Sequence, residues 1–411
     1  MNHRYLIREA DRCVKCGLCL PSCPTYELRR EEAESPRGRI ALIQGWATGQ
    51  LDADQTLLGH LDNCLLCRRC EGACPSDVAF SALMDEARAR LPRSVPAWLP
   101  DILANPRRQS TALRFAAAAA FAAAHKWFPS AIVRRMLAVA ALLRESGGHS
   151  RGSRSPAGAA VAGAGEKGKV ALFGGCMGGS VDSSALRAAA QLVAACGYRV
   201  EIPAAQRCCG AMHAHAGYAQ RAAAYRAANL RAFTARGYAA VVTVSSGCGA
   251  FLAEMDELDC AVMDAGAFVQ QQGGIGALPL ARVSRRVAYF LPCSLAAMGQ
   301  QRLIRELLQD LPGAQPIELQ GWGCCGGAGL QLLTSPAEGA RLVEPLVKQL
   351  RESQAECVAT TNSGCALQLQ LAAREAGLGI FVVHPLELVA EQLENNHAES
   401  LFPLRQAHHA D

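Results

Sequence analysis

The sequence has little net charge, few aromatic residues and no long uninterrupted apolar run. Its 411 residues include 41 basic and 36 acidic side chains, a net charge of +5, and aromatic residues make up 5%. No basic run is interleaved with aromatic residues. The composition therefore does not indicate a nucleic-acid-binding protein.

The most apolar stretch, residues 111–144, is too interrupted to predict a membrane span. A spanning helix needs about 18 or more apolar residues in succession, and here His125-Lys126 and Arg134-Arg135 intervene. We expect a helical hairpin packed on the protein, with a basic amphipathic helix on a membrane surface as the alternative.

The opening residues, MNHRYLIREADRC, contain no apolar segment of the kind that directs secretion. This absence bears on the 19 cysteines, because disulfide scaffolds are usually small secreted proteins. We therefore expect a cytoplasmic protein, with peripheral association at the cytoplasmic face of the inner membrane left open. Its cysteines should bind metal or take part in redox chemistry.

Two cysteine-rich segments, CVKCGLCLPSCP and CLLCRRCEGACP, share one spacing. We name them the first ladder (Cys13, Cys16, Cys19, Cys23) and the second ladder (Cys64, Cys67, Cys70, Cys74), and a proline follows each. The pattern C-x2-C-x2-C-x3-C-P is typical of [4Fe–4S] clusters. Three cysteines spaced in this way wrap a loop around three corners of a cubane, and the fourth corner is reached from elsewhere.

In two-cluster ferredoxins the fourth cysteine of each run serves the other cluster. We therefore predict one cluster on Cys13, Cys16, Cys19 and Cys74, and a second cluster on Cys64, Cys67, Cys70 and Cys23. Zinc is the alternative, but zinc sites usually show two C-x2-C pairs well apart.

Between the ladders the sequence predicts two helical stretches. Arg37 and Arg39 lie at the start of the first, where they either offset cluster charge or belong to a solvated helix start. A third helix is expected over residues 76–94.

The expected domain organisation follows from composition and patterning. It comprises a two-cluster ferredoxin-type domain (1–95), a helical connecting segment (96–145), a flexible Gly/Ser/Ala-rich linker (146–169) and two cysteine-rich domains (170–275 and 283–400). Within the linker, Gly163, Gly165 and Gly168 match G-x-G-x-x-G. A dinucleotide-binding loop must follow a strand and open a helix, and this segment precedes a strand, so we reject that function.

The second half of the sequence is an internal duplication. VALFGGC and VAYFLPC end at Cys176 and Cys293, TVSSGC and TTNSGC end at Cys248 and Cys365, and both halves contain a Cys-Cys doublet. The differences 293 − 176, 325 − 208 and 365 − 248 all equal 117, and self-similarity at a fixed period indicates a repeat.

Each copy reads as strands alternating with helices, and the second copy adds a late strand at GIFVVHP. Such alternation predicts parallel sheets. The expected fold class is thus α+β for a mainly helical, ferredoxin-like N-terminal domain, followed by α/β for two duplicated domains.

The repeated cysteines fall just past the C-terminal ends of predicted strands, the edge at which open α/β sheets bind ligands. Each copy offers four thiols for a further iron–sulfur cluster or a zinc ion, or else buried structural cysteines. The candidates are Cys176, Cys208, Cys209, Cys248, Cys293, Cys324, Cys325 and Cys365.

Other cysteines and histidines are weaker candidates. Cys196, Cys260 and Cys357 have no partner in the repeat, and we expect them to be structural. His213, His215 and His384 are either ligands or supporting donors, or else loop histidines, which is the interpretation we favour.

Taken together, a two-cluster module followed by two CCG-type cysteine-rich domains resembles the iron–sulfur subunits of bacterial glycolate oxidase. Lactate-utilisation iron–sulfur proteins are similar, as are subunits of anaerobic glycerol-3-phosphate dehydrogenase and of heterodisulfide reductase. The resemblance covers most of the chain apart from the linker. SPRGRI after the first ladder and PCSL…GQ at 292–300 favour the glycolate oxidase branch.

One departure from the family pattern limits what the resemblance implies. CCG domains often end each copy with C-x-x-C, whereas Phe251 and Gln368 stand where the last cysteine would be. This puts in doubt a noncubane cluster of the heterodisulfide type, and hence direct disulfide chemistry.

The resemblance implies an oxidoreductase subunit without catalytic residues of its own. We see no flavin-binding loop in the sequence, so oxidation of a CH–OH donor such as glycolate would take place on FAD-containing partner subunits. This chain would accept electrons singly and pass them to an acceptor such as quinone. The alternatives are a subunit of a lactate or glycerol-3-phosphate dehydrogenase complex, or a heterodisulfide-reductase-like catalytic subunit.

Overall fold

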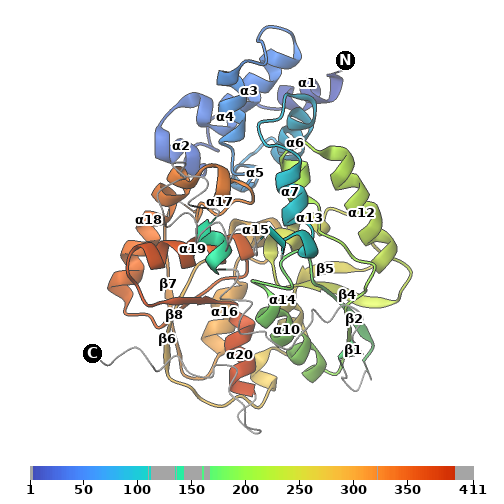
Figure 1. Ribbon diagram of the computed structural model, residues 1–411, viewed down its shortest axis with the longest axis vertical. Coiled ribbons are helices and arrows are strands. Elements are labelled where there is room, and N and C mark those ends of the chain that lie inside the picture. The colour runs from blue at the N-terminus through green and yellow to red at the C-terminus, as the bar shows by residue number, and fades with distance from the viewer. Residues whose placement is uncertain are drawn as a thin grey trace.

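The computed structural model describes residues 3–109, 111–112, 135, 137–142, 160–161, 167–321 and 323–393. In Figure 1 a helical N-terminal region lies against one end of two sheets. Among the described residues, no helix is long and apolar enough to cross a membrane. The hairpin predicted over 111–144 lies mostly outside the described residues, as do Gly163 and Gly165.

The N-terminal region is built from short helices. They are α1 (Arg4–Asp11), α2 (Pro24–Arg29), η1 (Glu32–Glu34), α3 (Pro36–Ala47), α4 (Gln55–Asp62), α5 (Arg69–Gly72), α6 (Phe80–Arg90) and α7 (Trp98–Leu103). The two helices expected between the ladders are α3 and α4, and the helix expected over 76–94 is α6. Their apolar faces meet in a core that includes Leu6, Ile43, Leu83 and Met84.

Local sequence explains where α3 and α4 begin. Ser35 caps α3 by accepting a hydrogen bond from the Gly38 backbone N–H, and Pro36 at the first helical position needs no such bond. Asp54 caps α4 in the same way by accepting from the Leu57 N–H. Such caps satisfy N–H groups that otherwise lack a partner within the helix.

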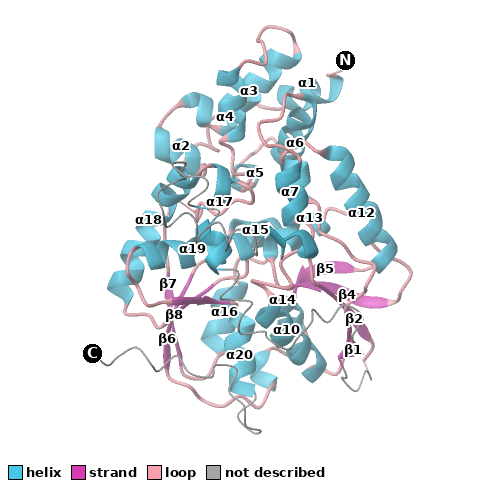
Figure 2. Ribbon diagram, viewed as in Figure 1, coloured by secondary structure: helices cyan, strands magenta, loops and turns pink. Residues whose placement is uncertain are grey.

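The two cysteine-rich copies form two sheets with one topology (Figure 2). The first sheet has the order β1 (Ala160–Val161), β3 (Arg199–Glu201), β2 (Lys169–Phe173), β4 (Tyr238–Thr243) and β5 (Ala261–Asp264). The second has the order β7 (Ala314–Glu318), β6 (Arg285–Tyr289), β8 (Cys357–Ala359) and β9 (Phe381–Val383). All pairs are parallel except β1–β3. The matching order of β3-β2-β4-β5 and β7-β6-β8-β9 confirms the duplication and the parallel sheets.

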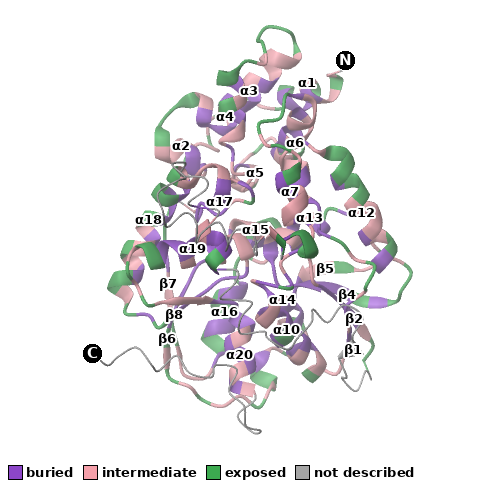
Figure 3. Ribbon diagram, viewed as in Figure 1, coloured by how far each residue is buried: buried purple, intermediate pink, exposed green. Residues whose placement is uncertain are grey.

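Helices from both copies share one core between the sheets. This inner layer comprises α10 (Ser183–Ala195), α14 (Ala265–Gln271), α16 (Leu303–Asp310) and α20 (Pro385–Leu393). Figure 3 shows that these helices carry buried residues together with intermediate or exposed ones, as in α16. On the outer faces, Phe233 of α12 (Ala219–Phe233) packs on Phe173, and Leu346 of α18 (Pro336–Ser353) packs on Ala288.

The other helices within the described residues follow strands or doublets, except η2, which follows α14. They are α11 (Ala211–His215), α13 (Ser246–Leu252), η2 (Ile275–Ala277), α15 (Cys293–Ala297), α17 (Gln331–Thr334) and α19 (Ser363–Glu375).

Two details of the predicted duplication were wrong. The late strand occurs in both copies, as β5 and β9; β5 was missed because it has only four residues and its first side chain is exposed. The doublets, taken member for member, are 116 residues apart (324 − 208 and 325 − 209). The copies therefore differ by one residue in the segment between β2 and the doublet.

Candidate metal centres

The two ladders line two adjacent cavities. Cys13, Cys16, Cys19 and Cys74 line the first, and the second is lined by Cys23, Cys64, Cys67 and Cys70. Cys70 also borders the first cavity, so the two sets of thiols share a wall. Each ladder thus contributes its fourth cysteine to the other ladder's cavity, which is the arrangement on which the predicted ligand sets depend.

The backbone around both ladders fits an inorganic cluster. Lys15 and Gly17 flank Cys16 with φ of 57° and 84°, and Leu66 and Arg68 flank Cys67 with φ of 49° and 60°. Left-handed residues alternating with right-handed ones turn successive backbone N–H groups to one side, and such concavities hold anions at many iron–sulfur sites. Three of these residues are not glycine, so their strained conformation is imposed by the loop.

Arg37 and Arg39, one beside each cavity, have their charges neutralised in different ways. Arg37 borders the first cavity; it pairs with Glu32 at 2.6 Å and donates to the Lys15 carbonyl. Arg39 borders the second cavity and is fully buried with Glu34, at 2.6 Å. Both arginines therefore form ion pairs with glutamates next to the thiols. Arg39 is buried, so the prediction of a solvated helix start does not hold for it.

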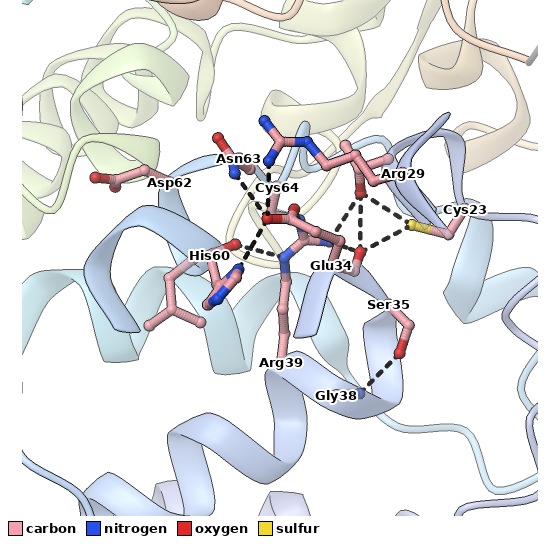
Figure 4. A network of polar contacts seen from close by, with 12 residues as sticks. Cys23, Arg29, Glu34, Ser35, Gly38, Arg39, His60, Asp62, Asn63 and Cys64 are labelled. Atoms are coloured by element: carbon pink, nitrogen blue, oxygen red, sulfur yellow. Dashed lines mark hydrogen bonds and ion pairs between the residues drawn. The ribbon is translucent and has the colours of Figure 1, made fainter. Parts of the chain in front are cut away.

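Glu34 is the centre of a buried polar network (Figure 4). Its carboxylate accepts from Arg39 and Asn63 and contacts His60 Nδ1 at 2.9 Å. Glu31 and His60 come within 4.8 Å of it in a geometry that could hold a cation. Because Arg39 already neutralises this carboxylate, no cation is needed there. Glu34 was missed from the sequence because nothing in EEAES distinguishes one glutamate from another.

Thr25 connects this network to a predicted ligand. The Arg39 guanidinium donates to Thr25 Oγ1, and Thr25 Oγ1 lies 3.3 Å from Cys23 Sγ. The same hydroxyl donates to the Glu34 carbonyl at 3.0 Å. A hydroxyl beside a ligating sulfur is the kind of hydrogen-bonding group that tunes a metal centre.

In the first cysteine-rich copy, four thiols converge above the ends of β2 and β4. Cys176 follows β2, Cys208 and Cys209 precede α11, and Cys248 lies in α13. Hydrogen bonds from Cys208 and Cys248 hold the pKa of Cys209 well below its usual range. This group of thiols is joined by direct sulfur contacts, as the repeated spacing predicted.

In the second copy the equivalent thiols also converge. Cys293 begins α15 and Cys365 lies in α19, and Cys325 Sγ lies 2.8 Å from Cys365 Sγ. Burial, followed by the neighbouring Cys324, raises the pKa of Cys293 to about 12. The pair Cys324 and Cys325 sits beside Gly326 with φ of 76°, a conformation that glycine adopts without strain.

The second ladder lies against both copies. The charges of Cys293 and Cys324 act on Cys67, whose pKa is raised first by burial and then by these two thiols. Gln331 donates to the Cys64 carbonyl at 3.1 Å, and Arg88 joins the Cys64 and His215 carbonyls. The thiols of the second ladder and of the second copy thus lie close together, and backbone contacts join the ladder to the first copy.

The loops after β4 and β8 join the two copies at this edge. Ser246 Oγ lies 2.7 Å from Ser294 Oγ, and Ser363 Oγ donates to Asp182 at 2.8 Å. Burial raises the pKa of Asp182 to about 7. The hydroxyl-rich TVSSGC and TTNSGC segments therefore hold the copies together.

The histidine prediction was wrong for two of three residues. His213 and His215 belong to α11 and bond Asp101 and Asp85, at 3.1 Å and 3.0 Å. Since these aspartates come from α7 and α6, the histidines join the first copy to the N-terminal region, and the five-residue helix was too short to recognise. His384 does lie in a loop after β9.

His384 and the unrepeated cysteines differ from one another in burial. Burial lowers the pKa of His384 to about 3, so its ring is neutral, and its Nδ1 accepts from the Leu386 N–H. Cys357 is buried in β8, whereas Cys196 and Cys260 are partly exposed. The structural role expected of Cys357 agrees with this burial.

Comparison with known proteins identifies both parts of the chain. Residues 9–78 match the 4Fe-4S dicluster domain, and residues 170–253 and 287–370 each match the CCG cysteine-rich domain. The N-terminal region is thus an iron–sulfur domain, in agreement with the ladders.

Relatives match over nearly the whole chain. A probable glycolate oxidase iron–sulfur subunit from Bacillus subtilis (strain 168) is 30% identical, over 93% of this chain and 94% of its own length. The glycolate oxidase iron–sulfur subunit of Escherichia coli (strain K12) is 27% identical over the same shares. One subunit of the fumarate reductase (CoM/CoB) of Methanothermobacter marburgensis is 24% identical, over 92% of this chain and 71% of its own length. The architecture and the identity to the Bacillus protein together show that the chain belongs to the family of glycolate oxidase iron–sulfur subunits.

Proposed function

We propose that this chain is the electron-transfer subunit of a glycolate oxidase complex. It accepts electrons from FAD-containing flavoprotein subunits that oxidise glycolate to glyoxylate, and it passes them to an acceptor such as quinone. The observation that carries the proposal is the placement of eight ladder thiols around two adjacent cavities, with Cys70 bordering both.

The clusters would supply one-electron transfer, and the chain's own residues supply the rest. Cys13, Cys16, Cys19 and Cys74 would hold one cluster, and Cys64, Cys67, Cys70 and Cys23 the other. Left-handed turns at the ladders aim backbone donors at each cavity. A cluster of this type takes no proton from a hydroxy acid, so the base for substrate oxidation belongs on a partner subunit.

The four thiols of each cysteine-rich copy would hold a further metal centre. Four thiols can bind either an iron–sulfur cluster or a zinc ion, and metal analysis of the purified chain decides between the two.

The experiment compares glycolate turnover with and without the partner flavoprotein. Anaerobically purified chain is analysed for iron and acid-labile sulfide, reduced for EPR, and assayed with a dye acceptor. We expect two reducible [4Fe–4S] signals and turnover only when the flavoprotein is present. Material without iron or sulfide would refute the proposal. Disulfide reduction by the isolated chain would instead support the heterodisulfide-reductase-like alternative.

The choice of substrate is tested in the same assay. Lactate and glycerol 3-phosphate, each with its own candidate flavoprotein, separate the glycolate complex from the related dehydrogenase complexes. If either compound is turned over faster than glycolate, the chain is a subunit of the corresponding dehydrogenase complex instead.

A further inference from the structure

Arg69 lies between the second ladder and the doublet of the second copy. It begins α5, which packs against α15, the helix that Cys293 begins. A Cβ placed on Gly323 would overlap Nη1 and Cζ of Arg69. The guanidinium therefore occupies the space that a side chain at residue 323 would fill, directly before Cys324.

This arrangement occurs once although both of its parts are duplicated. Leu18 stands in the first ladder where Arg69 stands in the second, and Leu18 is 60% exposed. In the first copy Arg207 precedes the doublet where Gly323 does in the second. Arg207 donates to three nearby backbone carbonyls instead of reaching another domain.

The position of the Arg69 charge matters because the surrounding thiols are buried. Cys70, Cys324 and Cys325 are all less than a tenth exposed, and in such surroundings a charge acts far more strongly than in water. The Arg69 charge lies close enough to act on Cys293 and Cys324. A fixed cation here stabilises any negative charge that an arriving electron adds to either set of thiols.

We propose that Arg69 is a positioning residue for electron transfer, which holds the second ladder against the second copy and raises the reduction potential of the centres bound by their thiols. This inference rests on the proposed function. It also makes the two copies unequal, because the first copy has no such cation from the N-terminal domain over its doublet among the described residues. Electrons leaving the ladders would thus be drawn toward the second copy.

The test is an EPR-monitored redox titration of the full chain, purified anaerobically with its clusters. Arg69→Met should lower the midpoint potential of at least one centre by about 59 mV, which corresponds to a tenfold change in a one-electron equilibrium. Arg69→Lys should recover most of the shift because it keeps the charge. The centre held by the first ladder should keep its potential in both variants.

Two further variants separate this role from general effects. Arg90→Met removes an arginine of α6 that pairs with Glu86 on the same helix and lines neither cavity, and it should leave the potentials unchanged. Gly323→Ala keeps the Arg69 charge but displaces the guanidinium, and should lower the same potential by less than Arg69→Met does. If Arg69→Met binds less iron, the Lys and Gly323→Ala variants decide the question.

Unchanged potentials in Arg69→Met with a full iron content would overturn the inference. An equal shift in Arg90→Met would also overturn it, because the loss of any positive charge would then suffice. Failure of the proposed function is a different result, since it would show in the unmodified chain as missing clusters or missing turnover with the flavoprotein.

Discussion

The two ladders have the same cysteine spacing and the same left-handed turns but opposite surroundings. In the first, Cys16 is exposed and lies between Val14 and Leu18, which are 67% and 60% exposed. In the second ladder, Arg68 pairs with Glu254 of the first cysteine-rich copy, and Arg69 lies against Gly323 of the second cysteine-rich copy. The cysteines determine what each loop can bind, whereas the residues between them determine which part of the surroundings each centre faces.

The largest effect is expected from replacing a ligand in each ladder. Cys16→Ser should weaken one cubane and leave the doublet sites intact, because its loop faces outward. Cys67→Ser should weaken the other cubane and also lower the metal content of the second copy, since Cys67 lies beside Cys293 and Cys324. Iron, acid-labile sulfide and EPR intensity measure both outcomes. Full intensity for both ladder centres in Cys16→Ser would show that the predicted ligands are wrong.

The next largest effect distinguishes the arginines beside the two cavities. Arg39→Met removes the buried cation that pairs with Glu34 and leaves this carboxylate to Asn63 and His60, and breaking a buried pair costs about 3–5 kcal/mol. Arg37→Met removes a partly exposed pair with Glu32, which solvent screens, so its loss should cost much less. Denaturant unfolding of the N-terminal domain, followed by cluster absorbance, measures the difference. Similar midpoints for the two variants would mean that Glu34 finds another partner.

A smaller effect is expected from the hydroxyl beside Cys23. Thr25→Val removes a buried hydrogen bond to the Glu34 carbonyl and should destabilise the domain by about 1 kcal/mol. It should also shift the potential of the second-ladder centre, because the hydroxyl oxygen lies 3.3 Å from Cys23 Sγ. Thr25→Ser should restore both properties.

Ser76 offers a matched control because it follows Cys74-Pro75 as Thr25 follows Cys23-Pro24. It borders the first cavity, so Ser76→Ala should leave the second-ladder potential unchanged. A shift of that potential in Ser76→Ala would contradict the separation of the two cavities.

The smallest effect is expected at the contact with the first copy. Arg68→Met breaks the ion pairs with Glu71 and Glu254, whose side chains are partly exposed. Exposed pairs of this kind contribute about 0.2–1 kcal/mol and are weakened by salt. Thermal unfolding at low and high salt should therefore show a small loss that disappears at high salt. A large loss at both would indicate that Arg68 stabilises the interface by packing.

Much of the fold could be predicted because its signals are local. Alternating apolar segments predicted the parallel sheets, and repeated cysteine landmarks predicted the duplication. The short elements β5 and α11 escaped prediction, since four or five residues carry too little periodicity to be recognised. Likewise, no local pattern marks Glu34 as the buried glutamate, because its burial depends on Arg39 and His60, which come from two other helices.

The sequence by itself determined the chemistry of the ladders, because the spacing of thiols along one loop decides which metal centre that loop can wrap. Only the tertiary structure decided which cysteine-rich segments lie next to one another. Contacts such as Arg69 with Gly323 and Ser363 with Asp182 join residues more than 180 positions apart. They exist because the strand ends of both copies meet the second ladder at one edge, where buried charges interact strongly and exposed ones do not.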